Sequence, residues 1–141
     1  MYEKILIPLD LAEGAPVHDL VAIARCLGQE GTVYTFLHVI EDIPAYIAQE
    51  IPGDVLDGVR REVEARLREI KLESGLPGEV VVRKGHPSTV ILDEIEERGH
   101  DCVVMGSHRP GFADLLLGST AARVVRHAPC SVHVHRPAAA S

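Results

Sequence analysis

The sequence predicts an α/β protein, a single domain with a five-stranded parallel sheet that helices cover on both faces. Short apolar runs rich in branched residues alternate along the chain with longer stretches of helical periodicity. This strict alternation favours right-handed crossovers between neighbouring parallel strands. The length of 141 residues suits one domain with a core of its own. We expect the domain to cover residues 1–137 and the tail over 138–141 to be disordered.

The first two strands and the helix between them follow from composition. Residues 4–9 are apolar after the initial lysine and rich in branched side chains, which is typical of a strand buried on both faces. Pro16 suits the first turn of a helix that runs to residue 27. Gly28 is expected to end that helix in the left-handed cap conformation. Residues 32–39 carry many β-branched and aromatic side chains, which predicts the second strand.

The middle of the chain is expected to hold its longest helix. Residues 41–54 contain two prolines and are expected to form a looser segment. The helix over residues 54–74 has an apolar stripe at helical spacing and pairs of opposite charges on its wet side. Gly75 is expected to end it, and residues 79–83 form the third strand.

The last third of the chain repeats the alternation. A helix over residues 87–98 begins at a proline and is expected to end at Gly99. Residues 102–105 form the fourth strand, residues 119–127 the last helix, and residues 131–135 the fifth strand.

Composition and charge narrow the classes of function. Hydrophobic residues make up 46% of the chain and charged residues 25%, as in a globular protein. The net charge of −7 argues against general binding to nucleic acid or to anionic lipid. No apolar run approaches the roughly 20 residues that cross a bilayer, and the N-terminus lacks a signal-peptide pattern. We therefore expect a cytoplasmic protein without membrane insertion. The three cysteines form no C-x-x-C pair and fit reduced, mostly buried thiols.

The distinctive loops all open on one edge of the predicted sheet. Each follows the carboxyl end of a strand, and they cover residues 8–10, 38–40, 85–87 and 106–108. Ligands of open parallel sheets bind beyond this edge, at the point where the strand order reverses.

One of these loops has the composition of an anion site. An apolar strand ends at Gly106, a polar loop with Ser107, His108 and Arg109 follows, and Gly118-Ser119-Thr120 opens a helix. The first turn of a helix leaves backbone N–H groups unpaired, and its dipole places partial positive charge there. Glycines remove the Cβ atoms that would hold a phosphate away, and hydroxyls add donors. An ordinary helix N-cap has the same composition, so both interpretations stay open from the residues alone.

Taken together, these motifs resemble those of the universal stress proteins, small α/β domains whose nucleotide-binding members hold ATP. The likeness extends from Ile5 to Val134. It is carried by Pro8-x-Asp10, Leu37-His38-Val39, Gly85-x-Pro87 and the Gly106…Gly118-Ser119 loop. The resemblance implies a Rossmann-like fold of the adenine nucleotide alpha hydrolase type.

The chain departs from the usual binding pattern of that family at one position. The pattern is Gly, two residues, Gly, nine residues, then Gly followed by Ser or Thr. Gly106 and Gly118-Ser119 match it, but Arg109 stands where the middle glycine belongs, and eight residues separate Arg109 from Gly118. A guanidinium can grip phosphate with two hydrogen bonds, so Arg109 is compatible with binding.

The resemblance implies a role for each candidate residue in binding ATP, with Mg²⁺ accompanying it. Asp10 would face the adenosine half, although a local Asx turn would use the same residue. Val39 and Met105 would contact the adenine, although plain core residues would look the same. The complete predicted set is Pro8, Leu9, Asp10, Val39, Met105, Gly106, Ser107, His108, Arg109, Gly118, Ser119 and Thr120.

No catalytic residue and no protein metal site is predicted. His133 and His135 have the spacing of two ligands on one strand face, but no third ligand is evident, so an exposed strand face is favoured. The resemblance also implies a homo-oligomer built through the last strand, residues 131–135, whose open edge can pair with a copy of itself.

Three functions compete. The first is an ATP-binding regulatory module of the stress response that acts on an unidentified regulatory protein partner. The alternative within the same fold is a dimeric interaction module that binds no nucleotide. An adenylate-forming or ATP-cleaving enzyme is disfavoured because the chain has no Ser-Gly-Gly-x-Asp, His-x-Gly-His or Gly-x-x-x-x-Gly-Lys segment. At most we expect a slow ATPase.

Overall fold

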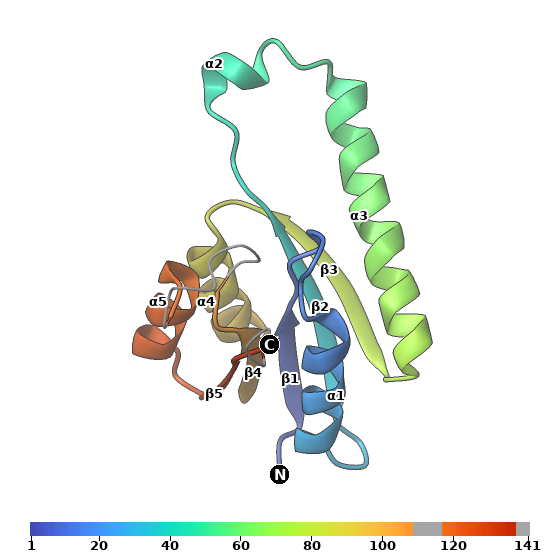
Figure 1. The fold of residues 1–141 in the computed structure, drawn as a ribbon, viewed down its shortest axis with the longest axis vertical. Coiled ribbons are helices and arrows are strands. Elements are labelled where there is room, and N and C mark those ends of the chain that lie inside the picture. The colour runs from blue at the N-terminus through green and yellow to red at the C-terminus, as the bar shows by residue number, and fades with distance from the viewer. Residues whose placement is uncertain (109–116, 138–141) are drawn as a thin grey trace.

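A computed structural model describes residues 1–108 and 117–137 (Figure 1). The predicted tail over 138–141 and the predicted site residue Arg109 lie outside these residues. The elements follow one another as β1 (Lys4–Pro8), α1 (Val17–Leu27), β2 (Val33–Ile40), α2 (Ala45–Ala48), α3 (Gly53–Ser74), β3 (Gly78–Lys84), α4 (Pro87–Arg98), β4 (Cys102–Gly106), α5 (Ser119–His127) and β5 (Ser131–His135).

The sheet confirms the predicted fold class. Its five strands are all parallel and lie in the order β3-β2-β1-β4-β5. The chain therefore adds β2 and β3 on one side of β1 in the sheet and then crosses over to add β4 and β5 on the other side of β1. The strand order reverses between β1 and β4, so the switch point lies in the middle of the sheet.

Two hydrophobic clusters show how helices cover both faces. Along β1, Ile5 and Ile7 point to the face that α1 and α3 cover, while Leu6 points to the face of α4 and α5. All three side chains are fully buried. The sequence of such a strand is a continuous apolar run because neither face is exposed to solvent. These strands could therefore be predicted from composition. Each cluster forms the hydrophobic core on one face of the sheet.

The glycine caps are as predicted at two helices and not at the third. Gly75 and Gly99 end α3 and α4 with φ of 69° and 68°, in the left-handed region. The left-handed cap predicted at Gly28 is wrong, because this residue ends α1 with an extended backbone, φ −81° and ψ 176°. A Cβ at this position would overlap the Tyr34 hydroxyl group, so any other residue would require the Tyr34 side chain to move.

The segment between β2 and α3 holds an element that the sequence did not predict. One helical turn, α2, lies within the stretch expected to be loose, and a proline precedes both α2 and α3. In Figure 1 this segment and the first turns of α3 stand well clear of the sheet.

The cysteines are free thiols in three environments. Cys102 is buried and Cys130 partly buried, as expected, but Cys26 is exposed, which corrects that expectation for one thiol. Burial raises the pKa of Cys102 to about 11, so this thiol stays protonated at neutral pH. Among the described residues, no helix is both long enough and apolar enough to span a membrane.

Candidate functional site

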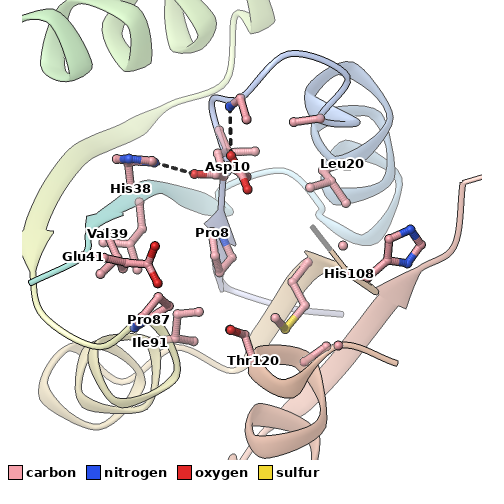
Figure 2. Close-up of a pocket in the computed structure, with 18 of the residues that line it drawn as sticks. Pro8, Asp10, Leu20, His38, Val39, Glu41, Pro87, Ile91, His108 and Thr120 are labelled. Carbon is pink, nitrogen blue, oxygen red and sulfur yellow. Dashed lines mark hydrogen bonds between the residues drawn. The ribbon is translucent and has the colours of Figure 1, made fainter. Parts of the chain in front are cut away.

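A cleft of about 780 Å³ opens at the carboxyl edge of the sheet, where the strand order reverses (Figure 2). The segments after β1, β2 and β4 form its inner side, and the first turns of α4 and α5 approach it from the other face. This is the place where open parallel sheets bind ligands.

The structure brings the predicted site residues together. Every one of them other than Arg109, which lies outside the described residues, lines this single cleft. They come from segments that are widely separated in the sequence: Pro8, Leu9 and Asp10; Val39; Met105 to His108; and Gly118 to Thr120.

The turn after β1 is held in place by its neighbour strand. The Leu9 N–H donates to the Leu37 carbonyl oxygen at 2.8 Å. The Leu9 carbonyl oxygen lies 2.7 Å from His38 Nδ1, as the dashed line in Figure 2 shows. A carbonyl oxygen can only accept, so Nδ1 carries the hydrogen, and Nε2 is an acceptor in the neutral ring. His38 therefore positions the turn that presents Asp10.

Asp10 makes the local contact that the sequence left open as an alternative. Its Oδ1 accepts a hydrogen bond from the Ala12 N–H at 2.8 Å, which is an Asx turn. An ionised carboxylate has several acceptor positions on its two oxygens. The turn therefore orients the carboxylate without using all of its acceptor capacity.

One side of the cleft is apolar. Met105 is 4% exposed and belongs to the cluster between the sheet and α4, and Val39 packs against the same cluster. Figure 2 shows Val39, Pro87 and Ile91 on one side of the cleft, with His108 on the opposite side. Such a surface can hold a flat, weakly polar ring.

The opposite end is built from backbone groups at the start of α5. The Gly118 N–H donates to the Ser107 carbonyl oxygen at 2.6 Å, and the Ser107 N–H donates to the His135 carbonyl oxygen at 2.9 Å. Ser107 Oγ and His108 Nδ1 share a hydrogen bond of 2.9 Å. Gly118 is the N-cap residue of α5, and no side chain caps this helix start. The first-turn N–H groups of α5 therefore receive no acceptor from a cap side chain.

The structure gives a physical reason for a glycine at position 118 that the sequence did not show. A Cβ on this residue would lie 3.2 Å from both the Ser107 carbonyl oxygen and His108 Cα. A side chain at this position would therefore require these backbone segments to move by a few tenths of an ångström. Glycine lets these two backbone segments approach each other, and the expectation that the missing Cβ makes room for phosphate stays a prediction.

The charges around the cleft are mixed. Its described lining includes the carboxylates of Asp10 and Glu41 and the imidazoles of His38, His86 and His108, but no lysine or arginine. Among the residues described, no three His, Cys, Asp or Glu side chains are grouped so that they could hold a metal ion. A polyanion would therefore meet backbone dipoles and imidazoles before any permanent positive charge from the described part of the chain.

Sequence reasoning missed several lining residues. Val59 and Val63 of α3 reach the cleft because this helix extends past the edge of the sheet, which no motif announces. Pro87 belongs to the Gly85-x-Pro87 motif and could have been included on that ground. His86 lies in the same predicted loop over residues 85–87 but was not named as a site residue, and its Nδ1 shares a 3.0 Å hydrogen bond with Ser88 Oγ.

The sheet order and the cleft at its switch point define a doubly wound α/β protein with a ligand-binding edge. A sequence profile described as "Universal stress protein family" matches residues 1–136. The chain belongs to this family.

Individual relatives agree with this assignment over nearly the whole chain. Universal stress protein G of Shigella flexneri is 32% identical over 142 residues, covering 96% of this chain and all of that protein. A universal stress protein of Methanothermobacter thermautotrophicus is 31% identical over 148 residues, covering 96% and 97%. Among solved structures, hypothetical protein MJ0577 superposes with a TM-score of 0.84 at 25% identity over 99% of both chains.

Some solved structures with the same fold contain nucleotides. A universal stress protein family protein from Arabidopsis thaliana has AMP bound (TM-score 0.67, 18% identity, 97% and 93% coverage). The universal stress protein from Archaeoglobus fulgidus is in complex with dAMP (TM-score 0.66, 18% identity, 94% and 97% coverage). At this identity the likeness to the present chain is one of fold.

Proposed function

We propose that this chain is an ATP-binding regulatory module of the stress response and that ATP binds in the cleft at the carboxyl edge of the sheet. The observation that supports it most is the convergence of separate sequence segments on that cleft. Proteins of the same fold that hold AMP and dAMP make an adenine nucleotide the preferred ligand class.

The adenosine half of the nucleotide lies on the apolar side of the cleft. The adenine ring packs against Val39 and Met105, where it is removed from water, and Asp10 accepts hydrogen bonds from the ribose hydroxyls. The Asx turn at Asp10 supports this role because it orients the carboxylate before the ligand arrives.

The phosphates lie at the start of α5. The N–H groups of Ser119 and Thr120 and their hydroxyls point donors toward them, and the helix dipole adds partial positive charge. Gly106, Ser107 and His108 close the other side. Because the described lining holds two carboxylates and no lysine or arginine, Mg²⁺ accompanies the ATP and Arg109 contributes positive charge. Bound Mg²⁺ would neutralise phosphate charge.

The nucleotide acts as a regulatory ligand. We assign no lining residue the role of general base for an attacking water, and we therefore expect ATP hydrolysis to be slow at most. Nucleotide occupancy changes how the module engages an unidentified regulatory protein.

We also propose a homo-oligomer through β5. This strand is at the edge of the sheet, with the partly buried Val132 and Val134 packed against the cluster on the α4 and α5 side and His133 exposed. Its outer edge can pair with the same strand of a second copy.

Thermal melting with and without Mg·ATP tests the binding proposal. A ligand at about a hundred times its Kd adds roughly 2.7 kcal/mol to the free energy of unfolding. For a domain of this size we expect the Tm to rise by several degrees. GTP at the same concentration is the control for base selectivity.

One feature favours the second candidate, a dimeric interaction module without nucleotide: the described lining of the cleft carries carboxylates but no permanent positive charge. No Tm shift at millimolar Mg·ATP, together with no nucleotide in the protein as purified, would select this candidate.

A further inference from the structure

A chain of hydrogen bonds runs from α5 to a histidine at the cleft. Arg123 of α5 donates from Nη1 to the Ser88 hydroxyl at 2.9 Å and to the Thr89 hydroxyl at 2.6 Å. Ser88 Oγ in turn lies 3.0 Å from Nδ1 of His86, which lines the cleft. Ser88 is 1% exposed, whereas His86 is exposed and therefore open to a ligand. The first turn of α4 thus joins a buried hydroxyl group to an imidazole at the cleft.

The direction of these bonds fixes the tautomer of His86. A guanidinium can only donate, so Ser88 Oγ accepts from Arg123. The buried Ser88 hydroxyl hydrogen then needs an acceptor, and among the described residues His86 Nδ1 is the one acceptor paired with it. A buried donor without an acceptor is strongly disfavoured, so Ser88 donates to Nδ1. In the neutral ring of His86 the hydrogen is therefore on Nε2, which is a donor.

His38, at the same cleft, has the opposite tautomer. Its Nδ1 donates to the Leu9 carbonyl oxygen, so its Nε2 is an acceptor. The two rings therefore differ in which nitrogen carries the hydrogen, and each is fixed by a bond within the chain. Within the described part of the chain, no hydrogen bond is made by Nε2 of His86. This donor is available to a ligand in the cleft.

His86 lies on the side of the cleft where we place the adenine. It directly precedes Pro87, which Figure 2 shows on the same side as Val39 and Ile91. Adenine carries unprotonated ring nitrogens that accept hydrogen bonds along its edges. A donor whose tautomer is fixed can pair with such a nitrogen, whereas it cannot pair with a protonated ring nitrogen.

We propose that His86 contributes to the base selectivity of the cleft by donating from Nε2 to a ring nitrogen of adenine. Ser88 and Arg123 are positioning residues, because they hold His86 in the tautomer that this contact needs. The inference rests on the proposed binding of ATP and deepens it by naming a residue that reads the base.

The tautomer is measured on the free protein, without nucleotide. Long-range ¹H–¹⁵N correlation spectra of the imidazole rings, recorded well above the usual histidine pKa of about 6.5, should show the hydrogen of His86 on Nε2 and that of His38 on Nδ1. Ser88→Ala should leave His86 as a mixture of both tautomers. Thr89→Ala is the matched control, because it removes the other acceptor of Arg123 and keeps the Ser88 hydroxyl. A hydrogen on Nδ1 of His86 in the wild type overturns the proposal.

The base contact is measured by calorimetry with Mg·ATP and with its 1-deaza, 3-deaza and 7-deaza analogues, each of which lacks one ring acceptor. The wild type should bind one analogue about threefold to tenfold more weakly than ATP, as expected for one neutral hydrogen bond. In His86→Leu, ATP itself should weaken by the same factor, and that analogue should bind as tightly as ATP does. His86→Gln, which keeps an N–H donor on a side chain of similar length, should recover part of the affinity.

The outcomes separate this inference from the proposed function. Equal ATP affinity in the wild type and in His86→Leu overturns the base contact and leaves ATP binding in place. A wild type that binds all the deaza analogues as tightly as ATP does the same. A wild type that binds no Mg·ATP overturns the proposed function and the base contact with it.

Discussion

Gly118 is the position where one added methyl group tests the site most sharply. An ideal Cβ there would lie 3.2 Å from the Ser107 carbonyl oxygen and 3.2 Å from His108 Cα. Both atoms belong to backbone, and the same carbonyl oxygen already accepts the Gly118 N–H at 2.6 Å. The added carbon must therefore push the two segments apart. Overpacking of this kind costs about 1–3 kcal/mol, so we expect Gly118→Ala near the lower value and Gly118→Val near the upper one.

The same displacement moves the start of α5, where the phosphates of ATP lie in our proposal. We expect the Kd for Mg·ATP to rise at least tenfold in Gly118→Val, a loss of about 1.4 kcal/mol. Chemical denaturation measures the stability of each variant, and titration calorimetry measures its affinity for Mg·ATP.

The control for Gly118 is another glycine of the same chain. Gly58 lies in α3, and a Cβ on it would have no neighbour within 4 Å. Gly58→Ala should raise stability by roughly 0.5–1 kcal/mol, because alanine restricts the unfolded chain and favours helix, and it should leave ATP affinity unchanged. If Gly118→Val keeps both the stability and the affinity of the wild type, the closure of Ser107 on Gly118 does not shape a phosphate site.

Two further predictions concern the buried histidine and the carboxylate at the cleft. His100 is buried, with Nε2 2.9 Å from Thr35 Oγ1 and Nδ1 3.2 Å from the Glu94 carbonyl oxygen, and burial lowers its pKa below the usual 6.5. The unfolded chain then binds the proton first, so stability should fall as pH drops below about 6.5, by about 1.4 kcal/mol per unit of pKa difference, and level off below the folded pKa. Urea titrations at a series of pH values should show this loss in the wild type, and a matching loss in His100→Gln would refute the assignment. At the cleft, Asp10→Ala removes the acceptor of the 2.8 Å bond from the Ala12 N–H and should cost about 1 kcal/mol of stability, whereas Asp10→Asn keeps that acceptor. Calorimetry should show weaker Mg·ATP binding for both variants, and unchanged affinity in both would remove Asp10 from the binding site.

Much of the fold could be predicted because its signals are local and repeated. Strands such as β1 are buried on both faces, so their composition alone identifies them. Alternation of strands and helices then leaves few topologies, and all of them bring the carboxyl ends of the strands to one edge. The segments around Asp10, Val39 and Gly118 could be placed on one cleft for this reason.

What could not be predicted depends on contacts between distant segments. Gly28 was predicted to adopt a left-handed cap, but its backbone is extended, and its missing Cβ leaves room for the hydroxyl group of Tyr34 in β2. Val59 lines the cleft only because α3 extends beyond the sheet. The role of Gly118 in closing on Ser107 is likewise visible only in three dimensions.

The most direct test of ATP binding at the strand switch point is a crystal structure of this protein grown with excess Mg·ATP. We expect the adenine against Val39 and Met105 and the phosphates within hydrogen-bonding distance of the Ser119 and Thr120 N–H groups. An empty cleft, or a nucleotide bound with its phosphates away from the start of α5, would contradict the proposal.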